Sequence, residues 1–139
     1  MRSASSSRHR CRRVDRRGLA AVEFAVCLPV IVLLVFGTIE ASSYIFLKQS
    51  LAVASYEGVR AATRLGGDND RARRAAQNIL DSRGVVGYRI EFPGGESSLA
   101  DRGEEIVIEV SAPSADNSPL AGDFVPGATL VARQVMTRE

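Results

Sequence analysis

The feature that most constrains this chain is a long apolar run near its N-terminus. From Leu19 to Ile39 there are 21 residues with a single charged side chain, that of Glu23. About 20 apolar residues in a helix span the ~30 Å hydrocarbon core of a bilayer. The run is also longer than the core of most cleaved signal peptides. We therefore expect a transmembrane helix over about residues 19–40.

Charge is distributed unevenly around this run. Residues 1–18 hold seven arginines and one aspartate, which leaves 11 basic and 15 acidic residues in the rest of the chain, although the whole chain is net +2. Because positive flanks stay on the cytoplasmic side, residues 1–18 should form a cytoplasmic leader and the acidic remainder should be exported. The basic residues are concentrated in the leader, so the overall charge does not indicate a nucleic-acid partner.

The first helix is predicted to continue outside the membrane as far as residue 65. Residues 41–65 contain no proline and one glycine, Gly58. Five small or apolar residues recur at helical spacing on one face. They are Leu51, Ala52, Ser55, Val59 and Ala62. Gly66 and Gly67 are then expected to end the helix.

A small α+β domain is predicted over residues 66–139. Asp68, Asn69 and Asp70 are N-cap candidates for a second helix at 70–82. Alternation of apolar and polar residues predicts strands at 86–92, 105–110 and 129–137. The expected fold is thus a long transmembrane helix, a short helix and an antiparallel sheet of about three strands. So small a domain is only marginally stable alone, and we expect it to pack on the exposed part of the first helix or on neighbours.

The distribution of reactive side chains argues against catalysis. His9 and Cys11 lie in the leader, Cys27 lies in the apolar run, and the later chain has neither residue type. A His/Cys metal site or a histidine-based triad in the exported part is therefore not expected. The acidic residues Glu104, Glu105 and Glu109 are more typical of a charged strand edge than of a cation site. We predict no enzyme activity, metal, cofactor or small-molecule substrate.

The segment Arg16-Arg17-Gly18-Leu19-Ala20-Ala21-Val22-Glu23-Phe24 carries the most functional information. An ionised carboxylate in an apolar helix costs of order 2.5–3.5 kcal/mol at the bilayer centre and less near the interface. A cut after Gly18 would give Leu19 an α-ammonium group one helical turn from Glu23. Glu23 could also meet the α-ammonium of an adjacent subunit, or simply reach the headgroups.

This segment resembles the processing site of type IV pilins, and residues 16–64 are more closely similar to the TadE-like family of minor pilins and pseudopilins from tight-adherence (Flp-type, type IVb) pilus systems. The resemblance rests on the junction above, on three further residues, and on the stretch Ala54-Ser55-Tyr56-Glu57-Gly58-Val59-Arg60-Ala61-Ala62. The three further residues are Pro29, Gly37 and Glu40. Phe24 replaces the Tyr of the major pilins, which favours a minor pilin.

The resemblance implies cleavage between Gly18 and Leu19 by a membrane prepilin peptidase, with Arg16 and Arg17 recognised in the leader. It also implies assembly with other pilins and the pilus machinery, and hence a role in adhesion or surface colonisation. Glu23 and Phe24 would act in assembly.

Three more residues bear on how the apolar helix packs. Pro29 removes one backbone hydrogen bond and can kink a helix. Gly37 and Ala41 form a pair of small residues four apart, which permits close helix packing. Glu40 lies about 25 Å from Glu23 along the helix by its rise, near the outer interface, where a solvated end of the membrane segment is the simplest interpretation.

Two other classes of protein stay open at this point. Residues 8–40 could be a secretion signal, since Arg16-Arg17 followed by Gly and Leu faintly resembles a twin-arginine motif; Glu23 and the lack of a convincing small-x-small site after Ile39 argue against it. The chain could also be an uncleaved single-pass membrane protein.

Overall fold

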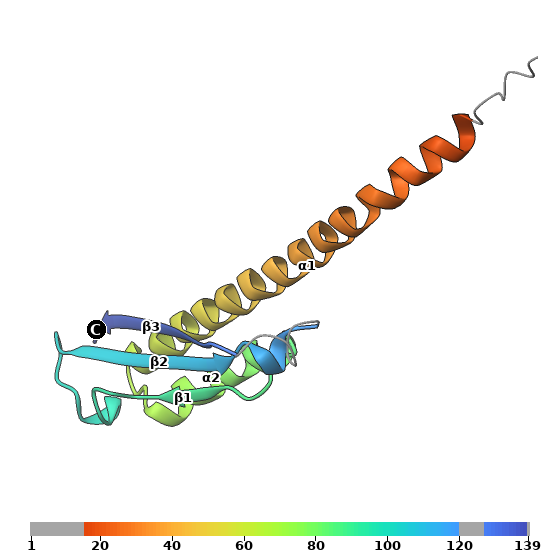
Figure 1. The fold of residues 1–139 in the computed structure, drawn as a ribbon. Coiled ribbons are helices and arrows are strands. Elements are labelled where there is room, and N and C mark those ends of the chain that lie inside the picture. The colour runs from red at the N-terminus through yellow and green to blue at the C-terminus, as the bar shows by residue number, and fades with distance from the viewer. Residues whose placement is uncertain (1–15, 120–126, 139) are drawn as a thin grey trace, which may run out of the picture. The chain divides into compact units, whose positions relative to one another are not determined.

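The structure is a computed structural model that describes residues 16–119 and 127–138. It contains two α-helices, a three-stranded sheet and two short 3-10 helices (Figure 1). They run in the order α1 (Arg16–Thr63), α2 (Asn69–Ser82), β1 (Arg89–Glu91), η1 (Ser97–Leu99), β2 (Glu105–Pro113), η2 (Ala115–Asn117) and β3 (Thr129–Thr137). The predicted α+β fold with a long N-terminal helix is confirmed. Contacts divide the chain into two compact units, Met1–Val35 and Phe36–Glu139. Residues 1–15, most of the expected leader, lie outside the described residues.

The first unit contributes the apolar part of α1. Every described side chain from residue 18 to residue 39 is exposed. Within the described residues, one helical stretch, Gly18–Thr63, is long and apolar enough to cross a membrane, and none of its most apolar 18-residue window is buried. An exposed apolar surface of this length is consistent with anchoring in a membrane.

In the second unit, α1 ends where the double glycine was predicted to end it. Its last residue is Thr63, and Gly66 adopts a left-handed conformation with φ of 72°. Gly67 donates its backbone N–H to the carbonyl of Arg64, and a Cβ at Gly67 would overlap the carbonyl of Ala62. Glycine is therefore required at both positions, for the backbone angle at one and for space at the other.

Helix α2 follows at once and has the cap that the sequence indicated. The Asp68 carboxylate accepts a hydrogen bond of 2.6 Å from the backbone N–H of Arg71, as expected of an N-cap residue. One face of the helix is buried through Ala72, Ala76 and Leu80. These residues are spaced four apart, so they lie on one face of α2, and this is the face that packs.

The sheet is antiparallel in the order β1-β2-β3, with β2 in the centre. β1 has three residues, fewer than the predicted 86–92. Gly87 just before it has φ of 67°, and the Asn117 side chain bonds both the N–H and the C=O of Val86. The side chain of Asn117 thus occupies the backbone groups that a longer strand would have used.

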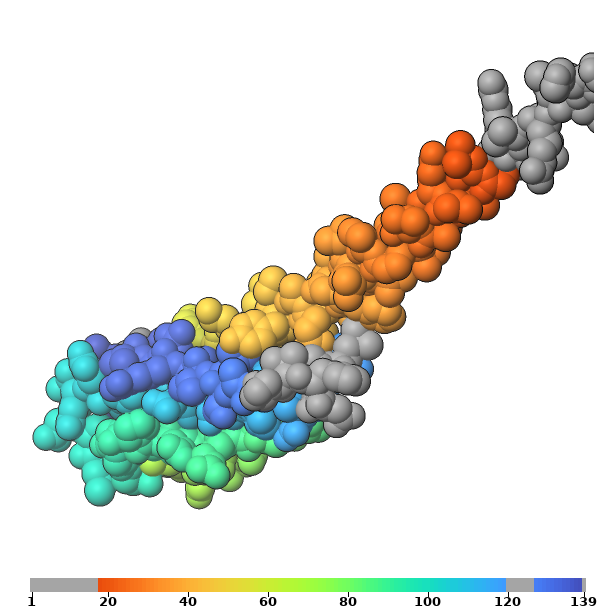
Figure 2. Space-filling view, viewed as in Figure 1, coloured from red at the N-terminus to blue at the C-terminus, as the bar shows by residue number. Residues whose placement is uncertain are grey.

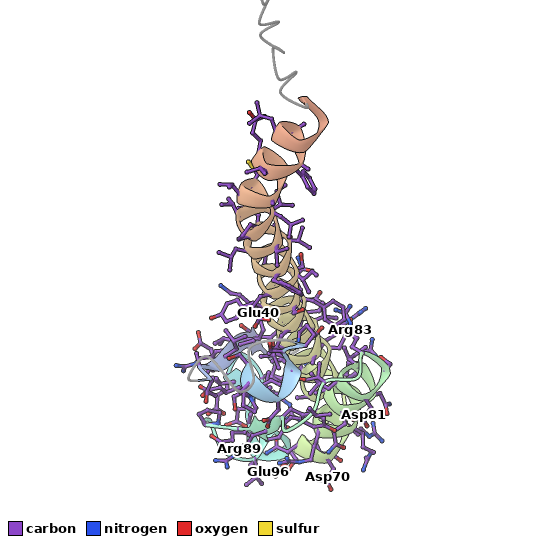
Figure 3. The ribbon with its side chains drawn as sticks, turned by 45° about the vertical axis from the view of Figure 1, so that its right-hand side comes forward. Glu40, Asp70, Asp81, Arg83, Arg89 and Glu96 are labelled. Atoms are coloured by element: carbon purple, nitrogen blue, oxygen red, sulfur yellow. The ribbon has the colours of Figure 1, made fainter. Side chains whose placement is uncertain are left out.

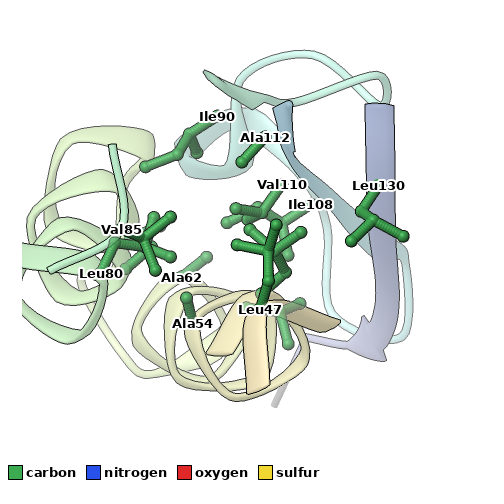
Figure 4. Packing of buried hydrophobic residues seen from close by; sticks show 14 of the residues in the cluster. Leu47, Ala54, Ala62, Leu80, Val85, Ile90, Ile108, Val110, Ala112 and Leu130 are labelled. Carbon is green, nitrogen blue, oxygen red and sulfur yellow. The ribbon is translucent and has the colours of Figure 1, made fainter. Parts of the chain in front are cut away.

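The core lies between the inner face of the sheet and the two helices (Figure 4). β2 buries every second side chain, from Ile106 to Ala112, and Leu51 of α1 is 1% exposed. Other buried core residues are Leu47, Ala54, Val59 and Ala62 from α1, Leu80 from α2, Val85 after it, Ile90 from β1 and Leu130 from β3. The small domain therefore takes a large part of its core from α1, as its size predicted.

At Gly58, α1 packs closely against both α2 and β2. A Cβ at this position would lie 2.6 Å from Cδ1 of Ile108 and 3.3 Å from the carbonyl oxygen of Ala72. Ile108 is fully buried, so its side chain has little room to move away. The absence of a side chain at Gly58 lets α1, α2 and β2 meet.

Candidate functional site

The expected cleavage junction lies inside the first turn of α1. Gly18 and Leu19 are its third and fourth residues, and the backbone of Arg16 and Arg17 precedes them in the same helix. The side chains of these two arginines, expected to be recognised in the leader, lie outside the described side chains. A Cβ built on Gly18 meets nothing within 4 Å, and its φ is not left-handed. Neither its backbone angle nor any contact with the described residues requires glycine at position 18.

Glu23 and Phe24 lie one turn further along the helix surface. Both side chains are exposed, and Phe24 is 59% exposed. Among the described residues, the Glu23 carboxylate has no hydrogen bond and no ion pair. Glu23 is the one charged residue among residues 19–39. Its carboxylate therefore lies exposed on the surface of α1.

Pro29 and Gly37 lie on the same exposed surface. Pro29 is accommodated within α1, which continues through it as an α-helix. A Cβ at Gly37 would meet nothing within 4 Å, so among the described residues nothing packs against Gly37, the first of the small-residue pair Gly37 and Ala41. Such a surface leaves room for the close approach of another helix.

Glu40 has a contact that the sequence did not indicate. The hydroxyl of Ser118 lies 2.6 Å from Oε1 and 2.8 Å from Oε2 of the Glu40 carboxylate, and Glu40 is half-buried. Figure 3 labels Glu40 on α1, close to the η2 region that precedes Ser118. The two residues are 78 positions apart. The hydrogen bond from Ser118 to Glu40 therefore connects α1 to the loop after η2. Glu40 is more than a solvated end of the apolar run, which was the simplest interpretation of the sequence.

The described part of the chain offers no assembled metal site. No group of three or more His, Cys, Asp or Glu side chains within residues 16–119 and 127–138 is placed to hold a metal ion. Glu105 begins β2, and Glu109 lies on its outer face opposite Glu91 of β1 and Arg133 of β3.

The fold defines a class: a small α+β domain built on the second half of a long helix whose first half is apolar and exposed. A family model described as TadE-like protein matches residues 18–60 of this chain. The match begins at Gly18, ends within α1, and covers 43 of the 139 residues. It confirms the TadE-like resemblance over this segment. Comparisons with curated proteins and with solved structures give no match.

Proposed function

We propose that this chain is a TadE-like minor pilin or pseudopilin that takes part in building a tight-adherence pilus, and through it in adhesion or surface colonisation. The observation that carries the proposal is the coincidence of the TadE-like match, which begins at Gly18, with a wholly exposed apolar helix that holds one carboxylate. Its role is structural, without catalysis.

The exposed apolar segment provides a surface that suits both a lipid bilayer and contact with other helices. In the bilayer, the side chains of residues 19–39 contact lipid, and in a fibre the same surface is available to neighbouring apolar helices. The Glu23 carboxylate is costly in lipid and is compensated by a cation. Cleavage after Gly18 by a prepilin peptidase would create that cation on Leu19, in the same subunit or in a neighbour.

The proposed orientation places the leader in the cytoplasm and the domain outside. Seven leader arginines outweigh Lys48, the one basic residue soon after the apolar run. The partners in this scheme are the membrane, the prepilin peptidase, other pilins or pseudopilins, and the assembly machinery.

The competing interpretations differ in where the mature chain begins. A secretion signal cut just past residue 40 would separate Glu40 from Ser118 and so remove an interaction of the domain. An uncleaved single-pass protein would keep its leader. The continuous α1 and the contact of Glu40 favour retention of the apolar segment.

The decisive experiment is to determine the N-terminus of the membrane-extracted protein by intact mass spectrometry and N-terminal sequencing. A chain that begins at Leu19 supports the proposal. A chain that begins after residue 40 identifies an exported soluble protein, and an intact leader identifies an uncleaved membrane protein; either result overturns it. Immunoblotting of fibres sheared from intact cells then tests whether the processed subunit is incorporated.

A further inference from the structure

Strand β3 is an edge of the sheet, and within the described residues no strand pairs with its outer side. β2 bonds to β1 on one side and to β3 on the other, in the order β1-β2-β3. The backbone N–H of Ser114 donates to Ala128, and that of Arg138 donates to Glu104. In an antiparallel pair, alternate residues bond to the partner strand. These two bonds therefore assign the even residues of β3 to β2 and turn the N–H and C=O groups of its odd residues outward.

The outward-facing backbone groups belong to five residues. They are Thr129, Val131, Arg133, Val135 and Thr137. Among the residues that the structure describes, none of these backbone groups has a hydrogen-bond partner. Val131 is 51% exposed and Val135 is 46% exposed, and the strand lies on the surface in Figure 2. A long edge strand of this kind is a template for a further strand.

The opposite edge of the sheet differs. β1 has only three residues, its exposed side chains Arg89 and Glu91 are charged, and it lies between Gly87 and Pro93. Short length, charge and proline are the usual means of protecting an edge. β3 has nine residues, no proline and one charged side chain, so it lacks this protection.

A groove runs beside β3 where the strand meets α1. It has a volume of about 360 Å³ and is lined by Met136 of β3 and by four residues at the end of α1 or directly after it. These are Tyr56, Arg60, Thr63 and Arg64. Arg60 pairs with Glu57 at 3.6 Å, whereas Arg64 and Arg133 have no ion pair among the described residues. The groove therefore presents the positive charge of Arg64, and the outer face of β3 presents Arg133, which lies opposite Glu109 of β2 without forming an ion pair with it.

We propose that the free edge of β3 binds, as a fourth strand, an extended acidic segment of a partner protein. The added strand would bond to the odd residues of β3. It would place an acidic side chain opposite Arg133 between apolar side chains opposite Val131 and Val135, because directly opposed residues of matching chemistry stabilise a strand pair. Its alternate side chains would face the groove, where acidic residues meet Arg64.

Charge favours this occupant over a second copy of the chain. If two β3 strands paired antiparallel in the register that sets Val131 opposite Val135, the two Arg133 side chains would oppose each other, and like charges that face each other are destabilising. The proposal goes beyond pilus assembly and does not require cleavage of the leader, so it can be tested on the full-length chain.

The test uses the full chain in detergent micelles and a fluorescent synthetic peptide of nine residues, the length of β3. The peptide carries Val, Glu and Val at the positions opposite Val131, Arg133 and Val135, with Thr and Glu between them. Two control peptides have Lys in place of each Glu, or N-methyl groups on the backbone nitrogens that would face β3. Fluorescence anisotropy should show binding of the first peptide and at least roughly tenfold weaker binding of both controls.

Protein variants place the binding at β3. Val135→Pro removes an outward-facing N–H without removing a bond to β2, and should abolish binding. Arg133→Glu changes an exposed side chain and should weaken binding at least roughly tenfold, whereas Arg74→Glu, the same charge change on α2, should leave it unaltered. Circular dichroism confirms that each variant is folded.

Three results would overturn the proposal. The first is failure of the acidic peptide to bind wild-type protein at millimolar concentration. The second is equal binding of the N-methylated peptide, which would exclude strand addition. The third is a dimer, seen by analytical ultracentrifugation, that Val135→Pro dissociates, which would make a second copy the occupant.

Discussion

The two halves of α1 have the same backbone conformation but opposite surroundings. From residue 18 to residue 39 every side chain is exposed, and nearly all are apolar. From Leu47 to Ala62 the helix is amphipathic, and its apolar face contributes to the core of the domain. Apolar side chains therefore have different roles along one helix. In the first half they form a surface suited to lipid or to another helix, and in the second half they stabilise the fold by packing in the core.

The largest effect in the first half of α1 is expected at the proposed cleavage junction, Gly18–Leu19. Gly18→Val should leave the leader attached, because a side chain at position 18 would crowd the approach of the peptidase to the Gly18–Leu19 bond. Intact mass should then exceed that of the processed protein by the 18 leader residues. Gly37→Val is the matched control, because neither glycine has an atom within 4 Å of an added Cβ. If Gly18→Val is processed as efficiently as wild type, the assigned junction is wrong.

Glu23→Leu separates membrane insertion from assembly. Removal of a carboxylate from an apolar helix lowers the cost of insertion, so the variant should remain fully in the membrane fraction. Its incorporation into sheared fibres should nevertheless fall sharply, because the α-ammonium group of the subunit or of its neighbour loses its partner. Quantitative immunoblots of both fractions check this. Normal incorporation would mean that Glu23 only reaches the headgroups.

The same residue type at matched positions contrasts the two halves directly. Leu51 is 1% exposed and Leu33 is 73% exposed. Leu51→Ala should destabilise the domain by about 2–5 kcal/mol, as large-to-small substitutions in a packed core do. Leu33→Ala should leave the free energy of unfolding unchanged within roughly 0.5 kcal/mol. Urea unfolding in detergent, followed by circular dichroism, measures both, and equal effects would contradict the division of α1.

Elements whose residues follow one local pattern could be predicted well. The apolar run, the glycine pair after α1, the Asp68 cap of α2 and the alternation in β2 all depend on residues close together in the chain. β1 was predicted too long because the bonds from Asn117 to Val86 join positions 31 apart.

The residues of the candidate site likewise fall into two groups, those that a local sequence pattern predicts and those that long-range contacts determine. The TadE-like resemblance was recognised from local residues, and the match over 18–60 confirms it, whereas cleavage between Gly18 and Leu19 stays a prediction. The contact of Glu40 with Ser118, across 78 positions, has no local pattern, and neither has the close packing at Gly58 against Ile108. Such long-range contacts depend on which faces of α1 and the sheet meet, which hydrophobic periodicity does not specify.

Glycine offers a second matched contrast within α1. Gly58→Ala should destabilise the domain by about 1–3 kcal/mol, because an added methyl group overpacks the meeting point of α1, α2 and β2. Gly37→Ala should leave stability unchanged or raise it by up to ~1 kcal/mol, because alanine favours the helix and nothing lies nearby. Thermal unfolding of the two variants and of the wild-type protein measures both changes in stability. A neutral Gly58→Ala would show that Ile108 has room to move.

The smallest expected effect concerns a hydrogen bond at the surface. Its contribution to the free energy of unfolding can be compared with that of the core residues. The Tyr88 hydroxyl donates to Oδ1 of Asp81 at 2.8 Å, and this hydrogen bond, together with burial and the negative charge of Asp81, raises the pKa of Tyr88 above its ordinary value of about 10. The neutral tyrosine is thus favoured in the folded state. Its contribution to stability is complete below the unfolded-state pKa and is lost as pH rises through the raised folded-state pKa.

Tyr88→Phe should therefore lower the free energy of unfolding by about 0.5–1 kcal/mol at pH 7, the usual net value of one hydrogen bond. The difference between wild type and variant should shrink as pH rises above about 10, because the wild-type tyrosine ionises. Urea unfolding at a series of pH values between neutral and strongly alkaline measures it. Ser98→Ala, at an exposed position, controls for the loss of a hydroxyl. A difference that stays constant through the alkaline range would show that the bond to Asp81 does not couple Tyr88 to folding.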